Sequence, residues 1–374
     1  MRVNQGFSGA GARALVWAVM AMGVAASVQA AEPAAVSAAA SAPLAPPPVE
    51  AFARLPLLSR VTLSPNGSTF AALMNRDDTT LLVTQPVGGG KLRGVLSSDN
   101  KEFRIRWVRW VNDDRLVVSV VFPSRRDFVA TSETRLLSVK ADGSGVINLV
   151  RNAPSPGSAT GSIRSQQIQD TVADWLPDDG KHILLALSEA DRVLPAVYKV
   201  NVETGERRMV RAPERDVYDW VTDAQHRVRV GVRTKGTGTE VTVADVDGRN
   251  WRTLWKAEDG SDAVVSPMGF GLDPNELYVR ARHEGRLAVF TVRLGDPALP
   301  RTLRLSHPPR GAVGDLVRSP RTGEVLGLRS AVDGADGESR AELWDTTWRP
   351  QARAIDLALP ARDNRLVDIS RDEQ

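Results

Sequence analysis

The stretch Leu63-Ser-Pro-Asn-Gly-Ser-Thr-Phe-Ala-Ala-Leu-Met-Asn75 joins a turn to a short apolar run. Pro65 has the φ angle that the first central position of a type I or II β-turn needs, and Asn66-Gly67 tolerate the conformations that follow. The run from Thr69 to Met74 is short, has no helix cap and ends at polar residues, which is typical of a strand. The unit is therefore a turn followed by a strand.

The same unit returns along the chain. Turn residues precede a short apolar strand at Ser64–Gly67, Asn112–Asp114, Pro177–Gly180, Thr222–Gln225, Asp273–Asn275 and Ser319–Gly323, and Ser370–Glu373 matches the start of a seventh unit. The starts recur at a period of about 47 residues, apart from one longer interval that holds the Pro/Ser/Gly-rich insertion Asn152–Ser165. A second strand in each period ends in a turn of its own, as at Asp142-Gly143 and Asp247-Gly248, so a period holds about four strands.

Four strands in about 40 to 50 residues is the size of one propeller blade. No long amphipathic helical segment is visible after residue 50. We therefore predict an all-β fold, a β-propeller of four-stranded blades over residues 50–374, with six full blades and the start of a seventh that is incomplete from about residue 363. A β-sandwich or two small barrels are the competing architectures, but neither requires a fixed period.

The number of blades, six or seven, stays open at this point. In a ring of seven, we expect an open junction between the first and last units, with Leu366–Ile369 as a lone inner strand. In a ring of six, the first and last units would touch along their length, and the tail would add to an existing blade.

The first thirty residues have the pattern of a secretory signal peptide. Arg2 and Arg13 precede the apolar run Ala14–Ala26, which ends in the small-residue cleavage pattern Val28-Gln29-Ala30. An uncleaved membrane anchor is the alternative, but the run is short against the roughly 20 residues that a spanning helix needs. Residues 1–30 therefore predict export to the periplasm or beyond, with no membrane attachment after cleavage.

Residues 31–49 are rich in Ala and Pro and predict a flexible linker, because they offer little apolar area to offset the entropy of ordering. The formal net charge of the chain is +3, and +1 remains without the two arginines of the leader. Such a balance argues against nucleic-acid binding. The chain has no cysteine, which excludes disulfides and thiolate metal sites.

Three tryptophans recur just before the turns of their units, in Trp110-Val-Asn-Asp, Trp175-Leu-Pro-Asp and Trp220-Val-Thr-Asp. We expect them to pack between neighbouring blades. The alternative is a stacking platform for a ligand, since aromatic rings near a channel can serve this purpose. Burial of the rings distinguishes the two.

Other candidates for chemistry are weak. The histidines are His182, His226, His283 and His307, and none has the short spacing of a chelating pair. Paired carboxylates such as Asp113-Asp114 and Asp178-Asp179 fall in predicted turns, where they accept local backbone donors. We therefore predict no catalytic residue, no metal and no cofactor in this chain, and no binding residue stands out.

Two further patterns have ordinary explanations. Gly88-Gly89-Gly90 precedes a strand and not a helix, so we expect a loop and not a phosphate-binding turn. Arg125-Arg126 lies in a predicted loop between strands, where a solvated pair is expected. Contact with a substrate carboxylate at the rim is the alternative for that pair.

The units beginning Ser64-Pro-Asn-Gly67 and Leu176-Pro-Asp-Asp-Gly-Lys181, with closing turns at Asp142–Gly145 and Glu203–Glu206, resemble the N-terminal propeller of the prolyl oligopeptidase family of serine peptidases. The resemblance covers Phe52–Gln374 and is strongest to exported bacterial members of the dipeptidyl-peptidase and acylaminoacyl-peptidase type. Related units also occur in the periplasmic propeller of the Tol-Pal system. The resemblance implies a propeller that caps an α/β-hydrolase domain and filters substrates by size, while the other domain carries the serine nucleophile.

The hydrolase domain has no counterpart in the sequence. Its nucleophile needs Gly-x-Ser-x-Gly on a strand-to-helix elbow, and no serine has glycine two residues before and two residues after it. The nearest approach, Gly6-Phe-Ser-Gly9, lies in the predicted leader. The βαβ alternation of a hydrolase sheet is missing as well. We therefore expect the chain alone to be catalytically inactive.

Two functions of different class follow. In the first, the chain is the non-catalytic propeller portion of an exported serine peptidase, which gates substrate access and docks a hydrolase domain on the same or a separate chain. In the second, it is a stand-alone periplasmic propeller that binds a protein or peptide partner, as in the Tol-Pal system.

Overall fold

The computed structural model describes residues 56–126, 128–151, 166–189, 193–306, 312–331, 340–360 and 364–373. The chain divides into two units, Met1–Ala53 and Arg54–Gln374, and all described residues belong to the second. The predicted leader and linker, the insertion Asn152–Ser165 and His307 lie outside the described residues.

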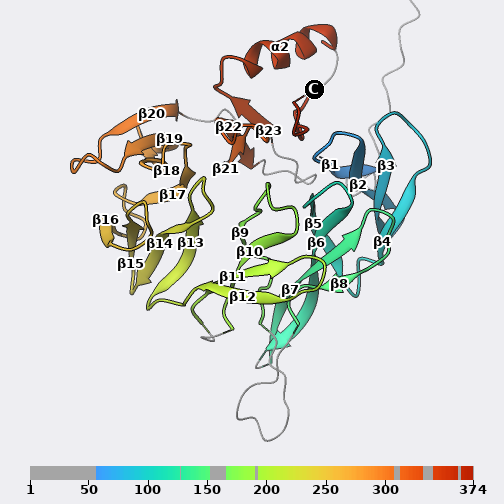
Figure 1. Ribbon diagram of the computed structural model, residues 1–374, viewed down its shortest axis with the longest axis horizontal. Coiled ribbons are helices and arrows are strands. Elements are labelled where there is room, and N and C mark those ends of the chain that lie inside the picture. The colour runs from blue at the N-terminus through green and yellow to red at the C-terminus, as the bar shows by residue number, and fades with distance from the viewer. Residues whose placement is uncertain are drawn as a thin grey trace, which may run out of the picture. The chain divides into compact units, whose positions relative to one another are not determined.

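The described residues form six antiparallel sheets that follow one another in chain order (Figure 1). The strands are β1–β4 (Leu58–Leu63, Thr69–Arg76, Thr79–Pro86, Arg93–Ser98), β5–β8 (Arg104–Trp110, Arg115–Arg126, Val129–Lys140, Ile147–Asn148), β9–β12 (Val172–Asp174, His182–Leu187, Ala196–Asn201, Arg207–Arg211), β13–β16 (Val217–Thr222, Val228–Lys235, Gly238–Ala244, Trp251–Glu258), β17–β20 (Val265–Phe270, Glu276–His283, Arg286–Arg293, Arg301–Ser306) and β21–β23 (Ala312–Arg318, Val325–Ala331, Arg340–Leu343). We call these groups sheets 1 to 6. Each is a meander of neighbouring strands, so the predicted propeller-like all-β fold is confirmed.

The turn that precedes β2 has the predicted geometry. The Gly67 amide donates to the Ser64 carbonyl (2.8 Å), and Gly67 has a φ of 73°. The Asn66 Oδ1 atom accepts from the Ser64 hydroxyl (2.8 Å) and from the Ser68 amide (2.9 Å). Local side-chain bonds therefore fix the turn before β2 begins.

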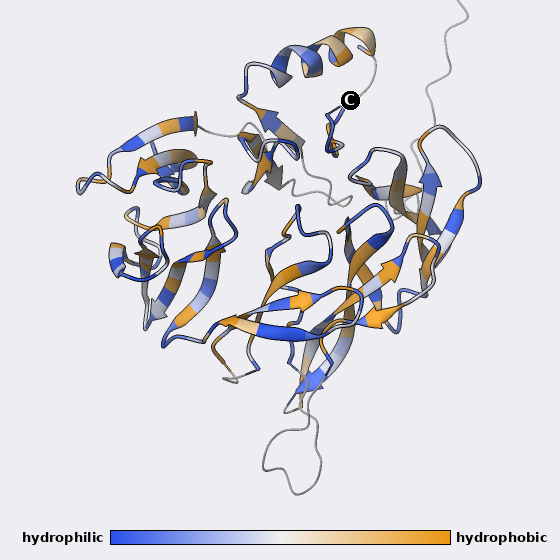
Figure 2. Cartoon of the chain, in the orientation of Figure 1, coloured by the Kyte–Doolittle hydropathy of each residue, from blue (hydrophilic) through white to orange (hydrophobic). Residues whose placement is uncertain are grey.

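The core lies between neighbouring sheets, because strand side chains alternate between the two faces. On β6, Leu116, Val118 and Val120 pack against sheet 1, whereas Val117 packs in the cluster shared with sheet 3. Three further clusters join sheets 3 and 4, sheets 4 and 5, and sheets 5 and 6. Figure 2 shows the matching alternation of hydrophobic and hydrophilic bands along the strands.

Sheet 6 differs from the first five sheets. It has three strands in the described residues, and the helix α2 (Trp348–Ala358) follows β23. The Asp345 carboxylate caps the helix start by accepting from the Thr347 and Trp348 amides (2.8 and 3.0 Å), and Pro350 falls in the first turn, where its missing N–H has no cost. The sequence interpretation, which identified no long amphipathic helical segment after residue 50, missed this helix.

Candidate functional site: the inner strands and the ring of turns

The first strands of the sheets are neighbours: β1 lies beside β5, β9 beside β13, β13 beside β17, and β17 beside β21. Contacts at the turns after these inner strands, or from strand residues beside the turns, join each sheet to the next. The Asn66 amide donates to Asp113 Oδ1 (2.8 Å), Asn112 Nδ2 to the Gly180 carbonyl (2.7 Å), Arg229 Nη1 to the Pro274 carbonyl (2.6 Å) and Arg318 Nη2 to the Phe270 carbonyl (2.6 Å), while His226 Nδ1 lies 3.0 Å from Asp174 Oδ2. These contacts link sheets 1 to 6 in order.

The tail supplies a seventh turn. The Glu373 amide donates to the Ser370 carbonyl (3.0 Å) and Glu373 has a φ of 58°, as the Gly67 amide and φ do in the first turn. The Ser370 hydroxyl donates to Asp372 Oδ1 (2.6 Å), which repeats the Ser64–Asn66 contact. The prediction of a seventh turn at Ser370–Glu373 is confirmed.

The seventh turn joins sheet 6 to sheet 1. Glu373 accepts from the Ser319 hydroxyl and forms an ion pair with Arg321 (3.1 Å). On the other side, the Arg371 amide donates to the Pro65 carbonyl (2.6 Å). The turns thus form a closed ring, which we call the turn ring.

The segment before the seventh turn is held by a side chain and not by a strand ladder. Asp368 Oδ2 accepts from the Thr62 hydroxyl (2.7 Å) and from the Leu63 amide (3.0 Å). No strand is assigned over Leu366–Ile369, so the expected lone inner strand was wrong. The Asp368 carboxylate thus bonds the edge strand of sheet 1, where the carbonyl of a neighbouring strand would otherwise be the acceptor.

Every inner strand is irregular where it pairs with its second strand. The register skips between Ser59 and Thr62 on β1, between Ile105 and Trp107 on β5, and between Val217 and Asp219 on β13. The inner strands β9, β17 and β21 skip in the same way. Bulges of this kind bend a strand and redirect its side chains. Arg60, Arg106, Tyr218 and Asp315 all lie at such skipped positions.

Charged side chains therefore gather along the inner strands. The Arg109 guanidinium lies over the Trp175 ring at 4.5 Å from its centroid. Desolvation lowers the pKa of Arg109. The carboxylates of Asp368, Asp315 and Asp174 oppose this effect. The stack thus joins Arg109 of sheet 2 to Trp175, which follows the first strand of sheet 3.

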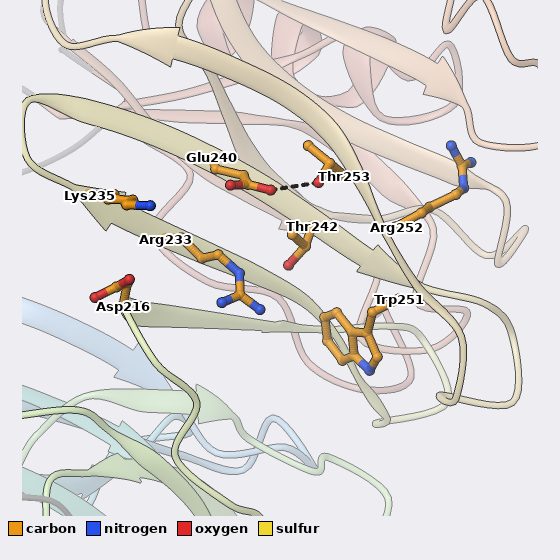
Figure 3. Close-up of a pocket in the computed structure, with 8 residues that line it drawn as sticks. All are labelled: Asp216, Arg233, Lys235, Glu240, Thr242, Trp251, Arg252 and Thr253. Atoms are coloured by element: carbon orange, nitrogen blue, oxygen red, sulfur yellow. Dashed lines mark hydrogen bonds between the residues drawn. The ribbon is translucent and has the colours of Figure 1, made fainter.

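A hollow on sheet 4 is a second candidate (Figure 3). Its volume is about 320 Å³, and it is lined by Asp216, Arg233, Lys235, Glu240, Thr242, Trp251, Arg252 and Thr253. Glu240 accepts from the Thr253 hydroxyl (2.5 Å), a bond that lowers the pKa of the Glu240 carboxyl. Thr242 donates to the Gly231 carbonyl (3.2 Å) and Arg252 to the Leu294 carbonyl (2.5 Å). Most polar groups of this hollow are already bonded within the protein, and they include no pair of nucleophile and base.

Each of the three described histidines has a contact of its own. His182 contacts Asp179 (2.7 Å), His226 contacts Asp174, and His283 packs its ring on Phe290. Within the described residues, no group of three His, Asp or Glu side chains is placed to hold a metal ion.

The paired carboxylates serve the turns. Asp179 accepts from the Lys181 amide (3.1 Å) and from Lys199 Nζ (2.7 Å), which agrees with the expected local role. Asp113 instead accepts from the neighbouring sheet, through the Asn66 amide. The Gly88–Gly90 segment is a loop before β4, as expected.

The tryptophans pack between sheets. Trp110 and Trp220 are only 6% and 3% exposed, and Trp175 packs partly buried against Trp107 with a ring separation of 5.8 Å. The Trp220 Nε1 atom donates to the Pro195 carbonyl (2.8 Å). The packing interpretation is confirmed for these rings.

A long hairpin carries features that the sequence interpretation missed. Strands β6 and β7 pair over their full twelve residues each, and Phe128 at the tip is 95% exposed with a φ of 66°. Arg126 forms an ion pair with Glu133 (2.9 Å), whereas Arg125 is exposed. We call Arg125, Arg126, Phe128 and Val129 the hairpin tip. The Arg125-Arg126 pair thus lies on paired strands and not in a loop.

No helix in the described part of the chain is long and apolar enough to span a membrane.

Comparison with known proteins gives one curated sequence match and many distant structural ones. Dipeptidyl aminopeptidase BIII of Pseudoxanthomonas mexicana is 28% identical over 161 residues, which are 41% of this chain and 22% of that enzyme. The acylaminoacyl peptidase of Pyrococcus horikoshii has a TM-score of 0.42 at 13% identity. That match covers 77% of this chain and 45% of the peptidase chain. TolB of Acinetobacter baumannii has a TM-score of 0.35 at 12% identity, and the match covers 64% of this chain and 52% of the TolB chain. No family model matches the sequence.

The chain thus spans about half or less of the length of these three proteins. The structural likenesses are too distant to add to the fold already described. The sequence match is to a peptidase of the kind that the turn-strand motifs resemble, so the predicted resemblance is confirmed over that part of the chain.

Proposed function

We propose that this chain is the non-catalytic propeller portion of an exported peptidase of the prolyl oligopeptidase type, which docks an α/β-hydrolase domain and limits the access of peptides to it. The sequence similarity to a dipeptidyl aminopeptidase carries this proposal. The absence of a Gly-x-Ser-x-Gly elbow supports a role for the chain beside a catalytic domain and not as one.

The hairpin tip is our candidate for the docking surface. The turn ring places all turns between first and second strands on one face of the unit. Turns between second and third strands, including the tip at Phe128, therefore lie on the opposite face. An exposed phenylalanine on a paired, ion-paired hairpin is a rigid apolar anchor. Leu58, where β1 begins, lies at the end of sheet 1 that is opposite the turn ring.

Catalytic inactivity of the purified chain is the first expected result. A fluorophosphonate probe should label no serine, and dipeptidyl chromogenic substrates should remain intact, because the sequence has no activated nucleophile. The measurement is mass spectrometry of the probe-treated protein. A label on a serine of this chain would overturn the proposal.

The second expected result concerns docking. The immobilised chain should retain a fluorophosphonate-reactive hydrolase from an extract of the source bacterium, and Phe128→Ser should reduce the retained label about tenfold or more. Leu357→Ser, which alters another exposed apolar residue on α2, is the matched control and should retain the label in full. Retention of non-hydrolase proteins alone would favour the stand-alone binding propeller.

A further inference from the structure

The hollow on sheet 4 has an aromatic wall that the protein holds in place (Figure 3). Trp251, where β16 begins, lines the hollow and is partly exposed. The Arg211 guanidinium lies 4.4 Å from the centre of the Trp251 ring, and Trp220 meets the same ring edge-on at 6.0 Å. The lining of the hollow includes neither Arg211 nor Trp220. Trp251 therefore presents part of its ring to the hollow in an orientation that is fixed before a ligand arrives.

The strand face inside the hollow carries oriented oxygen atoms. Thr242 and Thr253 are directly paired on β15 and β16. Thr242 donates to the Gly231 carbonyl (3.2 Å), and Thr253 donates to the Glu240 carboxylate (2.5 Å). The hydroxyl and carboxylate oxygens keep lone pairs that can accept from a ligand. The internal bonds thus orient these acceptors and leave them able to bind.

One cation and one acid of the hollow lack a close partner. Lys235 and Asp216 both line it, and the Thr234 amide donates to the Asp216 carbonyl (2.9 Å), which joins their two segments. Within the part of the chain that the structure describes, Lys235 has neither a hydrogen bond nor an ion pair, and the Asp216 carboxylate has only a long contact of 3.8 Å with the exposed Arg215. This side therefore offers a ligand one free donor group and one free acceptor group.

The two arginines of the hollow are already bonded. Arg233 is paired with Glu214, and Arg252 donates to the Leu294 carbonyl (2.5 Å). An anion drawn to the free lysine would be repelled by the free carboxylate, and a cation drawn to the carboxylate would be repelled by the lysine. An uncharged ligand whose groups both donate and accept hydrogen bonds therefore suits the hollow better than either ion.

We propose that the hollow binds a neutral β-linked disaccharide, with one sugar ring on Trp251 and the hydroxyls of the other at Asp216 and Lys235. A sugar hydroxyl both donates and accepts, which matches the mixed groups of the hollow. The substituents of β-linked glucose are equatorial, so the ring faces carry C–H groups that pack on an aromatic ring. The volume of about 320 Å³ is at the lower end of the roughly 300–1,000 Å³ of ligand pockets, as a small ligand requires. The inference goes beyond the proposed function, because the hollow is on sheet 4 and the hairpin tip is on sheet 2.

The test is ligand-observed NMR, in which saturation passes from the purified chain to the protons of bound cellobiose. We expect cellobiose to bind, and Trp251→Leu to weaken binding about tenfold because the stacking ring is lost. Lys235→Met removes a donor and Asp216→Asn removes the charge of an acceptor, so each should weaken binding about threefold. Arg249→Met is the matched control, because it removes an exposed cation of sheet 4 outside the hollow, and it should bind as the unmodified chain does.

Four outcomes would overturn the inference. They are no transfer to cellobiose, unchanged affinity in both Lys235→Met and Asp216→Asn, an equal loss in Arg249→Met, and displacement of cellobiose by inorganic phosphate, which would indicate an anion site. Thermal unfolding of each variant verifies that the fold is retained. Lys235 is exposed and Asp216 partly so, and their variants decide the question if Trp251→Leu does not fold.

Discussion

Replacing Arg229 by methionine is expected to lower the free energy of unfolding by about 3 kcal/mol. Arg229 is only 1% exposed, and its guanidinium donates to the Ala244 carbonyl (2.9 Å) and to the Pro274 carbonyl (2.6 Å). It also stacks on Phe270 at 4.7 Å and lies 3.7 Å from Asp223. Methionine keeps an unbranched apolar stem but leaves the two carbonyls unbonded and the buried Asp223 carboxylate without part of its compensating charge.

Urea unfolding, followed by fluorescence, measures this change. Arg249→Met is the control, because the Arg249 side chain is 83% exposed and its ion pair with Asp247 is long at 3.8 Å. An exposed pair of this kind contributes little, so the control should lose less than about 0.5 kcal/mol. If the two variants have the same stability, Arg229 does not join sheets 4 and 5 as described.

Removal of residues 366–374 is expected to have the second-largest effect, a loss of about 3 kcal/mol. The deletion removes the Asp368 contacts with Thr62 and Leu63, the Arg371 contact with Pro65 and the Glu373 contacts with sheet 6. Each such bond contributes about 0.5–1.5 kcal/mol net. Because the deletion opens the turn ring between sheet 6 and sheet 1, these two sheets should lose the most stability.

Hydrogen exchange distinguishes this local effect from general destabilisation. Amides of β1 and β21 should exchange faster in the shortened chain, while those of sheet 3 retain their protection. Uniform acceleration through all sheets, or no change in β1, would show that the tail does not close the ring.

The sequence was sufficient for the repeat, because turn residues and short apolar strands are local signals. Ser64, Pro65 and Gly67 specify their turn through bonds within a few residues. The same local logic identified Ser370–Glu373 as a turn. What each turn contacts was not visible, because the partner of Asn66 is Asp113 in the next sheet.

Other features depended on tertiary context. Helix α2 begins at a cap formed by Asp345, but its position after a three-stranded sheet follows no repeat. The tail contact between Asp368 and Thr62 joins residues about three hundred positions apart, so it could not be inferred from spacing. The interpretation of Arg125-Arg126 as a loop pair gave no sign of the twelve-residue strand β6 or of the exposed Phe128 that follows it.

The closed turn ring is tested most directly by a disulfide between the tail and the first turn. A Cβ atom at Gly67 would lie 3.1 Å from the Ser370 Cβ, and the chain has no other cysteine. We predict that G67C combined with S370C forms an intramolecular disulfide on mild oxidation, seen by mass spectrometry. The pair G88C and S370C, in which Gly88 has no neighbour within 4 Å, should stay reduced. Failure of the first pair to cross-link, or equal cross-linking of both pairs, would contradict closure of the ring by the tail.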